Sequence, residues 1–472
     1  MNAGLQQRIE RVFAAQQERA LRLRRSTAAE RIAVLRRLLA TFERHIPAMR
    51  AAGAADFCRP EAEVDLTEVL PVVSEIRHTI RHLRHWMRPR RVRPTLALFG
   101  TSASIRYEPR GVCLIVVPWN YPFNVAFGPL VSAIAAGNTA IIKPSEQSPA
   151  MSKLIREIVE ETFDESEVAV FEGAADVAVA LQALPFDHVF FTGSPAVGKQ
   201  VMAAAAKHLS SITLELGGKS PTIVDASANP RTAARNVMWG TFTNGGQTCI
   251  APDYLLVQEA VYDRFVEESV RWIEATYGAT PEARRTSPDY CRIVNQRHYD
   301  RIVALLDDAV GHGARIVFGG ERDPATRYIG PTLLADVPLE SRIMEEEVFG
   351  PVVPVLSYRR LDDAIALVNS RPKPLALYVY STDRRTIARV LAETSAGDTV
   401  INHNLLHYLH LNLPFGGVNN SGIGKAHGYW GFQAFSHQRS VLRERFSLVS
   451  WLYPPYTPMV RKLIDLTRRW AT

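Results

Sequence analysis

The middle of the chain alternates short apolar strands with alanine-rich helices, and this alternation constrains the fold more than any other feature. A βαβα order places parallel strands side by side beneath covering helices. A nucleotide is the usual ligand of such a sheet. We therefore predict an α/β fold with a Rossmann-like sheet. The segments that carry the pattern are CLIVVPW (113–119), TAIIK (139–143), MSKLIREIVEETF (151–163), EVAVF (167–171), HVFF (188–191), AVGKQVMAAAAKHL (196–209) and SITLEL (211–216).

The segment GSPAVGK, Gly193 to Lys199, follows one predicted strand and opens the next predicted helix. Free N–H groups and the positive dipole end of a helix attract phosphate, so we expect a pyrophosphate at this turn. The segment lacks the GxGxxG spacing of the strict dinucleotide fingerprint. The turn alone is therefore only a moderate indication of a dinucleotide site.

The region before this sheet is helical and basic. Residues 1–110 contain 21 arginines, no lysine and 11 acidic residues, in a chain of net charge +7. Nucleic-acid binding is one interpretation of that charge. However, Leu, Ile, Val and Phe recur at helical spacing opposite the arginines, which favours solvated helix faces. Because no recognisable nucleic-acid-binding module occurs in the chain, we expect no nucleic-acid partner.

The four cysteines, Cys58, Cys113, Cys249 and Cys291, are widely separated and form neither a CxxC pair nor a zinc-type Cys/His spacing. This distribution favours a reducing compartment. The N-terminus lacks the apolar run of a signal peptide, and no stretch reaches the roughly 18 apolar residues of a membrane helix. We expect a cytoplasmic protein.

Cys249 stands out because it follows Gly245 and Gly246 in the segment NGGQTCIAPDY. Glycine lets a ligand approach the main chain closely, so one interpretation is a thiol presented to a substrate. The alternative is a small buried hydrophobe, since free cysteine is among the most buried residue types. The segment alone favours the alternative.

Six stretches, taken together, change that balance. In this order they resemble the aldehyde dehydrogenase superfamily over essentially the whole chain, and VMAAAAKHL (201–209), CIAPDY (249–254) and YPPYT (453–457) are most similar to its class-3 branch of fatty and aromatic aldehyde dehydrogenases. The six stretches are PWNYPFN (118–124), FTGSPAVGK (191–199), LELGGKSP (214–221), GGQTC (245–249), EEEVFGPV (345–352) and LPFGGVNNSG (413–422).

The resemblance implies the catalytic residues. Cys249 attacks the aldehyde to give a thiohemiacetal, which passes a hydride to a nicotinamide and becomes a thioester. The Asn120 amide and the Cys249 backbone N–H are the implied oxyanion donors. Glu215 is the implied base for hydrolysis, and its apolar neighbours should raise its pKa toward the working pH.

The resemblance also implies the cofactor site. A carboxylate at the ribose accepts two hydroxyls and repels a 2′-phosphate, so we predict NAD, with NADP left open because a lysine is adjacent. The implied residues are Trp119, Gly193 and Ser194 at the pyrophosphate, Lys143 and Glu146 at the adenine ribose, and Glu347 and Phe349 at the nicotinamide end.

By the same resemblance, Trp239, Thr243, Phe415 and His427 line the substrate funnel, which suits medium-to-long aliphatic or aromatic aldehydes. The expected assembly is a homodimer whose two β-like arm segments pair across the interface. The tail is a candidate substrate gate, or a weak contact with a membrane surface. The predicted parts are an NAD(P)-binding domain (1–90 and 110–216), an α/β catalytic domain (217–422), an oligomerisation arm (91–109 and 437–446) and the tail (447–472).

Two features depart from the family pattern. Asn419 occupies a common glycine position, and we expect the turn to survive because Asn tolerates a left-handed backbone. His403, His407 and His410 share a spacing that could hold a metal. We expect no metal, because no Asp, Glu or Cys accompanies them, and predict pocket-lining or hydrogen-bonded histidines.

Two alternative functions are considered. A CoA-acylating dehydrogenase transfers its acyl group to CoA and does not need a water-activating glutamate at position 215. A catalytically silent homologue should have lost Cys249, Glu215 or Asn120. Because all three residues are present, we treat both rivals as minor.

Overall fold

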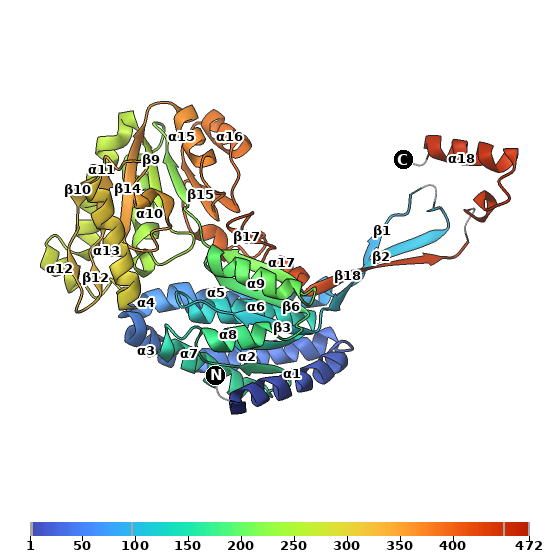
Figure 1. The fold of residues 1–472 in the computed structure, drawn as a ribbon. Coiled ribbons are helices and arrows are strands. Elements are labelled where there is room, and N and C mark those ends of the chain that lie inside the picture. Colours follow the sequence, from blue (N-terminus) through green and yellow to red (C-terminus); the bar gives the residue numbers. More distant parts are fainter. Residues whose placement is uncertain (1–2, 96–97, 447–448, 471–472) are drawn as a thin grey trace.

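Alternate residues of the central strands face two different helical layers. The computed structural model describes residues 3–95, 98–446 and 449–470. In it, Leu114 and Ile141 pack toward α1, α8 and α9 (Figure 1). Their neighbours Ile115 and Ile142 pack toward α2, α5, α6 and α7. This burial on both faces explains why the strands are almost continuously apolar. The helices are α1 (Ala3–Leu23), α2 (Ala28–Arg44), α5 (Leu70–Trp86), α6 (Pro122–Ala136), α7 (Pro149–Thr162), α8 (Ala175–Gln182) and α9 (Pro195–Ala206).

The chain forms two lobes, each built around one large sheet. The first lobe contains a six-stranded sheet of order β17-β7-β6-β3-β4-β5. Every neighbouring pair is parallel except β17 and β7. The strands predicted from the alternating pattern are therefore present. They are β3 (Val112–Val116), β4 (Thr139–Lys143), β5 (Val168–Val170), β6 (His188–Gly193) and β7 (Ser211–Leu216), joined late in the chain by β17 (Gly422–Ile423).

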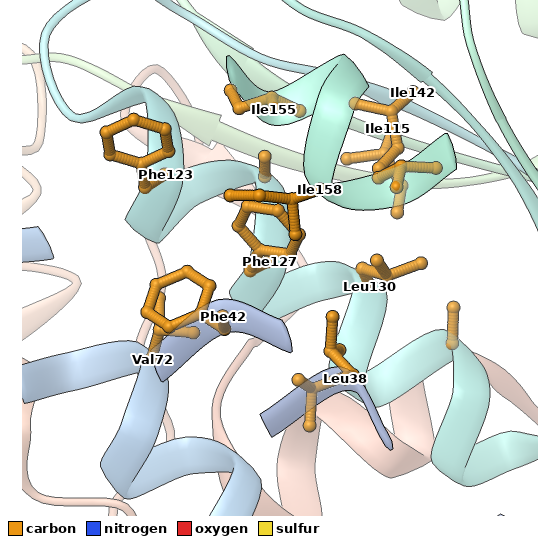
Figure 2. Packing of buried hydrophobic residues seen from close by; sticks show 14 of the residues in the cluster. Leu38, Phe42, Val72, Ile115, Phe123, Phe127, Leu130, Ile142, Ile155 and Ile158 are labelled. Atoms are coloured by element: carbon orange, nitrogen blue, oxygen red, sulfur yellow. The ribbon is translucent and has the colours of Figure 1, made fainter. Parts of the chain in front are cut away.

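Figure 2 shows the packed layer that fixes the N-terminal helices against this lobe. Phe42 of α2 meets Phe127 of α6 edge to face, with ring centroids 5.1 Å apart. Ile155 and Ile158 of α7 close the same cluster. Burying a side chain of this size contributes about 1.5–3 kcal/mol to stability. The same cluster includes residues of α3 (Ile46–Phe57), α4 (Glu61–Val64) and the π-helical turn Asp65–Val69, so these elements are packed against the first lobe.

The second lobe contains a seven-stranded sheet of order β10-β13-β14-β9-β8-β15-β16, parallel except for the β10–β13 pair. Its strands are β8 (Pro221–Val224), β9 (Tyr254–Gln258), β10 (Arg315–Phe318), β13 (Thr332–Ala335), β14 (Val352–Tyr358), β15 (Ala376–Tyr380) and β16 (Asp398–Ile401), with a separate pair β11 (Arg322–Asp323) and β12 (Tyr328–Ile329). Its helices are α10 (Pro230–Phe242), α11 (Tyr262–Tyr277), α12 (Pro281–Arg285), α13 (Gln296–Gly311), α14 (Arg342–Glu345), α15 (Leu361–Asn369) and α16 (Arg384–Glu393).

The chain then returns to the first lobe. Strand β17 pairs with β7 beside Glu215, and α17 (Gly428–Ala434) packs against α5 and α6. Asn419 adopts the left-handed backbone expected of it, with φ of 55°, and accepts a hydrogen bond from the Gly422 N–H at 3.2 Å. The turn is thus retained with asparagine in place of glycine.

An arm projects from the body of the molecule (Figure 1). It is a three-stranded antiparallel sheet of β1 (Arg90–Val92), β2 (Thr101–Pro109) and β18 (Ser436–Glu444). We expected the segments 91–109 and 437–446 to pair across a dimer. Instead, β18 pairs with β2 of the same chain along its whole length, because α17 leads directly into Ser436, which lies opposite Pro109 at the end of β2.

The tail lies at the far end of this arm (Figure 1). Beyond residues 447–448, which lie outside the described part of the chain, it forms a short turn (Val449–Leu452) and the amphipathic helix α18 (Pro458–Trp470). Within the described residues, no helix combines the length and apolar character that crossing a membrane requires.

Candidate active site

A cavity of about 950 Å³ lies between the two lobes, and most of the predicted site residues line it. The first lobe contributes the loop after β3, the turn after β6 and the end of β7. The second lobe contributes the segment after α10 and the loop before β14. The predicted residues on its wall are Trp119, Asn120, Gly193, Ser194, Glu215, Trp239, Thr243, Cys249, Glu347 and Phe349.

Cys249 reaches this cavity because the backbone before it takes left-handed angles. Asn244, Gly245 and Gly246 have φ of 55°, 59° and 73°. A Cβ on Gly246 would stand 2.2 Å from the Gly350 carbonyl oxygen, so only glycine fits there. The Cys249 side chain is partly exposed toward the cavity. Of the two interpretations of this cysteine, the structure supports the presented thiol.

Hydrogen bonds place Asn120 beside the cysteine loop. Its Nδ2 donates to the Gln247 carbonyl oxygen at 3.1 Å. The Gln247 side chain donates to the Asn244 carbonyl at 2.9 Å and accepts from the Val294 N–H at 2.9 Å. One amide hydrogen of Asn120 is therefore engaged in holding the side chain, which leaves the other to face the cavity.

The thiol of Cys249 is a weak acid in this setting. Burial, followed by the nearby Glu347 and Glu215, raises the pKa of this thiol to about 12. The group therefore rests as a thiol at neutral pH. A nearby positive charge would be needed to favour the thiolate.

Glu215 lies at the end of β7 with its carboxylate in the cavity wall. It is buried, and neither carboxylate oxygen has a hydrogen-bond partner. Burial raises its pKa well above the usual range, with Asp398 raising it further and Lys425 opposing the shift. The direction of this shift agrees with the rise expected from the apolar neighbours of Glu215.

The opposite part of the wall fits a dinucleotide. Ser194 caps the N-terminus of α9 beside Gly193, and both residues line the cavity, so the N-terminal end of this helix lies at its wall, where a phosphate is favoured. The Oε1 atom of Glu347 is buried without a hydrogen-bond partner. A Cβ on Gly217 would lie 2.1 Å from the Glu347 Oε2 atom, so the glycine makes room for that carboxylate. Burial raises the pKa of Glu347 to about 8.

Lys143 and Glu146 do not line this cavity. The Lys143 ammonium donates to the Glu146 carboxylate at 2.9 Å, and their side chains are 6% and 45% exposed. An exposed carboxylate is screened by solvent, so any discrimination by Glu146 against a phosphate is modest.

The lining of the cavity is largely apolar. Trp239 and Thr243 lie on its wall as predicted. Most of the other lining residues were not predicted from the sequence. The apolar segment LLHYL (405–409), which contains His407, is the one signal that could have indicated some of them. The missed lining residues include the apolar and aromatic side chains of Leu66, Pro71, Val125, Trp272, Leu405, Leu406, Tyr408 and Leu409.

The structure does not place Phe415 and His427 in the cavity wall. Both rings pack behind Tyr408, at centroid distances of 4.9 Å for Phe415 and 4.5 Å for His427. Tyr408 itself lines the cavity, whereas these two residues do not. His427 instead lines a small side cavity of about 90 Å³ beside Glu75.

The three histidines have different environments. His403 lines the main cavity, whereas His410 is exposed and lies outside the cavity lining. His407 was expected to line the pocket or to be hydrogen-bonded, but it is buried and neither ring nitrogen has a partner. Among the described residues, no cluster of three or more His, Cys, Asp or Glu side chains could hold a metal ion.

The chain is similar to known proteins over most of its length. A model described as "Aldehyde dehydrogenase family" matches residues 1–441. The chain is 45% identical over 402 residues to the 4,4'-diaponeurosporen-aldehyde dehydrogenase of Staphylococcus aureus, covering 85% of this chain and 86% of that protein. It is 41% identical over 452 residues to aldehyde dehydrogenase family 3 member A2 of Rattus norvegicus, covering 95% and 90%.

The fold has a solved counterpart. The substrate-bound state of Staphylococcus aureus AldH superimposes with a TM-score of 0.92 at 41% identity, covering 99% of this chain and 100% of that one. The predicted class-3 resemblance and the predicted α/β fold are thereby confirmed.

Proposed function

The chain belongs to the aldehyde dehydrogenase family, and from this premise we propose that Cys249, Asn120 and Glu215 together oxidise an aldehyde to a carboxylic acid. The family fixes the reaction as aldehyde oxidation with NAD or NADP. One observation supports the assignment of residues: a thiol, an amide donor and an unpartnered carboxylate line a single cavity.

The proposed reaction begins at Cys249. Its Sγ atom bonds to the carbonyl carbon as the thiol loses its proton to water, and the oxygen becomes an oxyanion. The Asn120 amide and the Cys249 backbone N–H donate to this oxyanion, and losing one such donor typically costs about 10²–10³ in rate. When bound, the oxidised cofactor supplies a positively charged ring that favours the thiolate and accepts the hydride.

The acyl group then remains on Cys249 as a thioester. Glu215 takes a proton from water, the resulting hydroxide attacks the thioester carbon, and the sulfur departs. Glu347 and Phe349 would hold the nicotinamide end of the cofactor, and Trp119, Gly193 and Ser194 its pyrophosphate. Glu146 and Lys143 would hold the adenine ribose through a rearrangement of their ion pair.

The apolar wall supports medium-to-long aliphatic or aromatic aldehydes as substrates. We further propose a homodimer. No described residue of the tail lines the cavity of its own chain, so a gate over the substrate mouth requires the tail of a second copy.

A panel of aldehydes from propanal to dodecanal, with benzaldehyde, tests this function by NADH or NADPH absorbance. We expect KM to fall as the chain lengthens, because the apolar wall binds more of it. A chain ending at Phe446 should lose this preference for long substrates while turning over propanal almost normally. Equal loss for all lengths would make the tail structural, and no signal with any aldehyde would indicate a silent homologue.

Replacing Glu146 by glutamine tests the cofactor assignment. We expect NADP affinity to rise by roughly three- to tenfold, because one repulsive charge is removed at a partly exposed site. Glu157→Gln, which removes a similarly exposed carboxylate paired with Lys153, is the control and should change nothing. Unchanged NADP affinity in Glu146→Gln would show that the ribose lies elsewhere.

A further inference from the structure

Arg59 is a fully buried arginine to which the mechanism so far gives no role. It follows Phe57 and Cys58, where α3 ends on a left-handed residue, and precedes α4. Its side chain has no exposed surface. A buried cation is costly unless it is paired and hydrogen-bonded, so its partners indicate what it is retained for.

The guanidinium of Arg59 bonds directly to the segments that carry the catalytic groups. Its Nη2 atom donates to the Asn120 carbonyl oxygen at 2.6 Å and to the Asn244 Oδ1 atom at 2.6 Å. Its Nη1 atom donates to the Glu68 carboxylate at 2.9 Å. One side chain thus joins the N-terminal helical layer, the Asn120 loop and the turn before Cys249.

These contacts form a closed set of hydrogen bonds, which we call the amide clamp: Arg59, Asn120, Asn244 and Gln247. The Asn244 Nδ2 atom donates to the Asn120 carbonyl at 3.1 Å and to the Gln247 carbonyl at 3.2 Å. The same Gln247 carbonyl accepts from the Asn120 Nδ2 atom. Both the backbone and the side chain of Asn120 are therefore held by the clamp.

The surroundings of Arg59 fix its orientation. The guanidinium lies 4.6 Å from the Phe57 ring centroid and 5.3 Å from that of Tyr121. Glu63 adds a second carboxylate at 3.9 Å. A planar fork stacked on rings in this way presents its donors in fixed directions, which a flexible ammonium does not.

We propose that Arg59 is a positioning residue for the oxyanion donor: it holds Asn120 and the turn before Cys249 in one register, so that the Asn120 amide and the Cys249 N–H face the same point. This rests on the proposed function of Asn120. Because an oxyanion donor must be aimed to act, loosening the clamp should slow acylation without weakening cofactor binding.

The test is a double-mutant cycle read by the rate constant of the first NADH burst. Arg59→Lys keeps the charge but cannot serve three acceptors in the same geometry, and we expect it to slow the burst by roughly 10- to 100-fold. Asn120→Ala should slow it at least as much. If Arg59 acts through Asn120, adding Arg59→Lys to Asn120→Ala should slow the burst by less than about threefold more.

Two further variants separate positioning from general stability. Arg284→Lys alters another buried arginine, paired with Glu321 away from the cavity, and should lower the melting temperature without slowing the burst. Should Arg59→Lys fail to fold, Asn244→Asp serves in its place. It retains the acceptor for Arg59, removes the donor to Asn120, and should show the same non-additivity.

The outcomes are distinct. An unchanged burst in Arg59→Lys, or a full additive loss in the double variant, would overturn the proposal, as would an equal loss in Arg284→Lys. A wild-type protein without a burst, or an Asn120→Ala variant with a normal one, would instead overturn the proposed function.

Discussion

Replacing Cys249 by alanine should abolish both the initial burst and the steady production of NADH. The thiol is the sole sulfur among the residues lining the main cavity, and without it no covalent adduct can donate a hydride. Losses on removing a nucleophile are typically about 10⁴–10⁶-fold. The measurement is NADH absorbance under single-turnover and steady-state conditions.

Cys113→Ala is the matched control for this variant. Cys113 is buried in β3 and lies outside the cavity lining, so its removal should cost stability and leave turnover nearly intact. A Cys249→Ala protein that still forms NADH at more than a trace would remove Cys249 from the mechanism.

Replacing Glu215 by glutamine should separate the two halves of the reaction. Acylation needs Cys249 and Asn120, so the burst of about one NADH per active site should remain. Hydrolysis needs a base, and its loss typically costs about 10²–10⁴ in rate. The variant should therefore stall, and an added thiol such as CoA should release the acyl group from it.

The pH dependence of the hydrolysis rate is an independent test of Glu215 as the base. Burial raises its pKa well above the usual range, and only the ionised form takes a proton from water. The wild-type hydrolysis rate should therefore rise with pH through a midpoint well above that of an ordinary glutamate. Glu215→Gln should lack this rise. If the rate of the variant rises with the same midpoint, another residue acts as the base.

The sequence predicted the features that depend on local pattern. The strands β3 to β7 follow from the alternation of apolar strands with helical segments. The position of Cys249 in the cavity wall agrees with the presented thiol that the family resemblance implied, whereas the glycine segment alone favoured a buried cysteine. Asn419 kept its turn because asparagine tolerates a left-handed backbone.

Features that depend on distant packing were not predicted. Nothing near Arg59 in the sequence shows that it meets Asn244, 185 positions away. The pairing of β2 with β18 joins segments more than 300 positions apart, and the packing of Phe415 and His427 against Tyr408 is encoded by no motif. Such contacts depend on which distant residues are buried together in the folded chain, and local sequence patterns do not determine this.

The central claim is that the substrate becomes covalently attached to Cys249 and is released through Glu215. Mass spectrometry of Glu215→Gln mixed with aldehyde and cofactor tests it directly. We predict that the intact chain gains the mass of one acyl group, that the gain maps to the peptide containing Cys249, and that the gain is lost in Cys249→Ala. An unmodified Cys249 in a stalled variant, or an acyl group on another residue, would contradict the account.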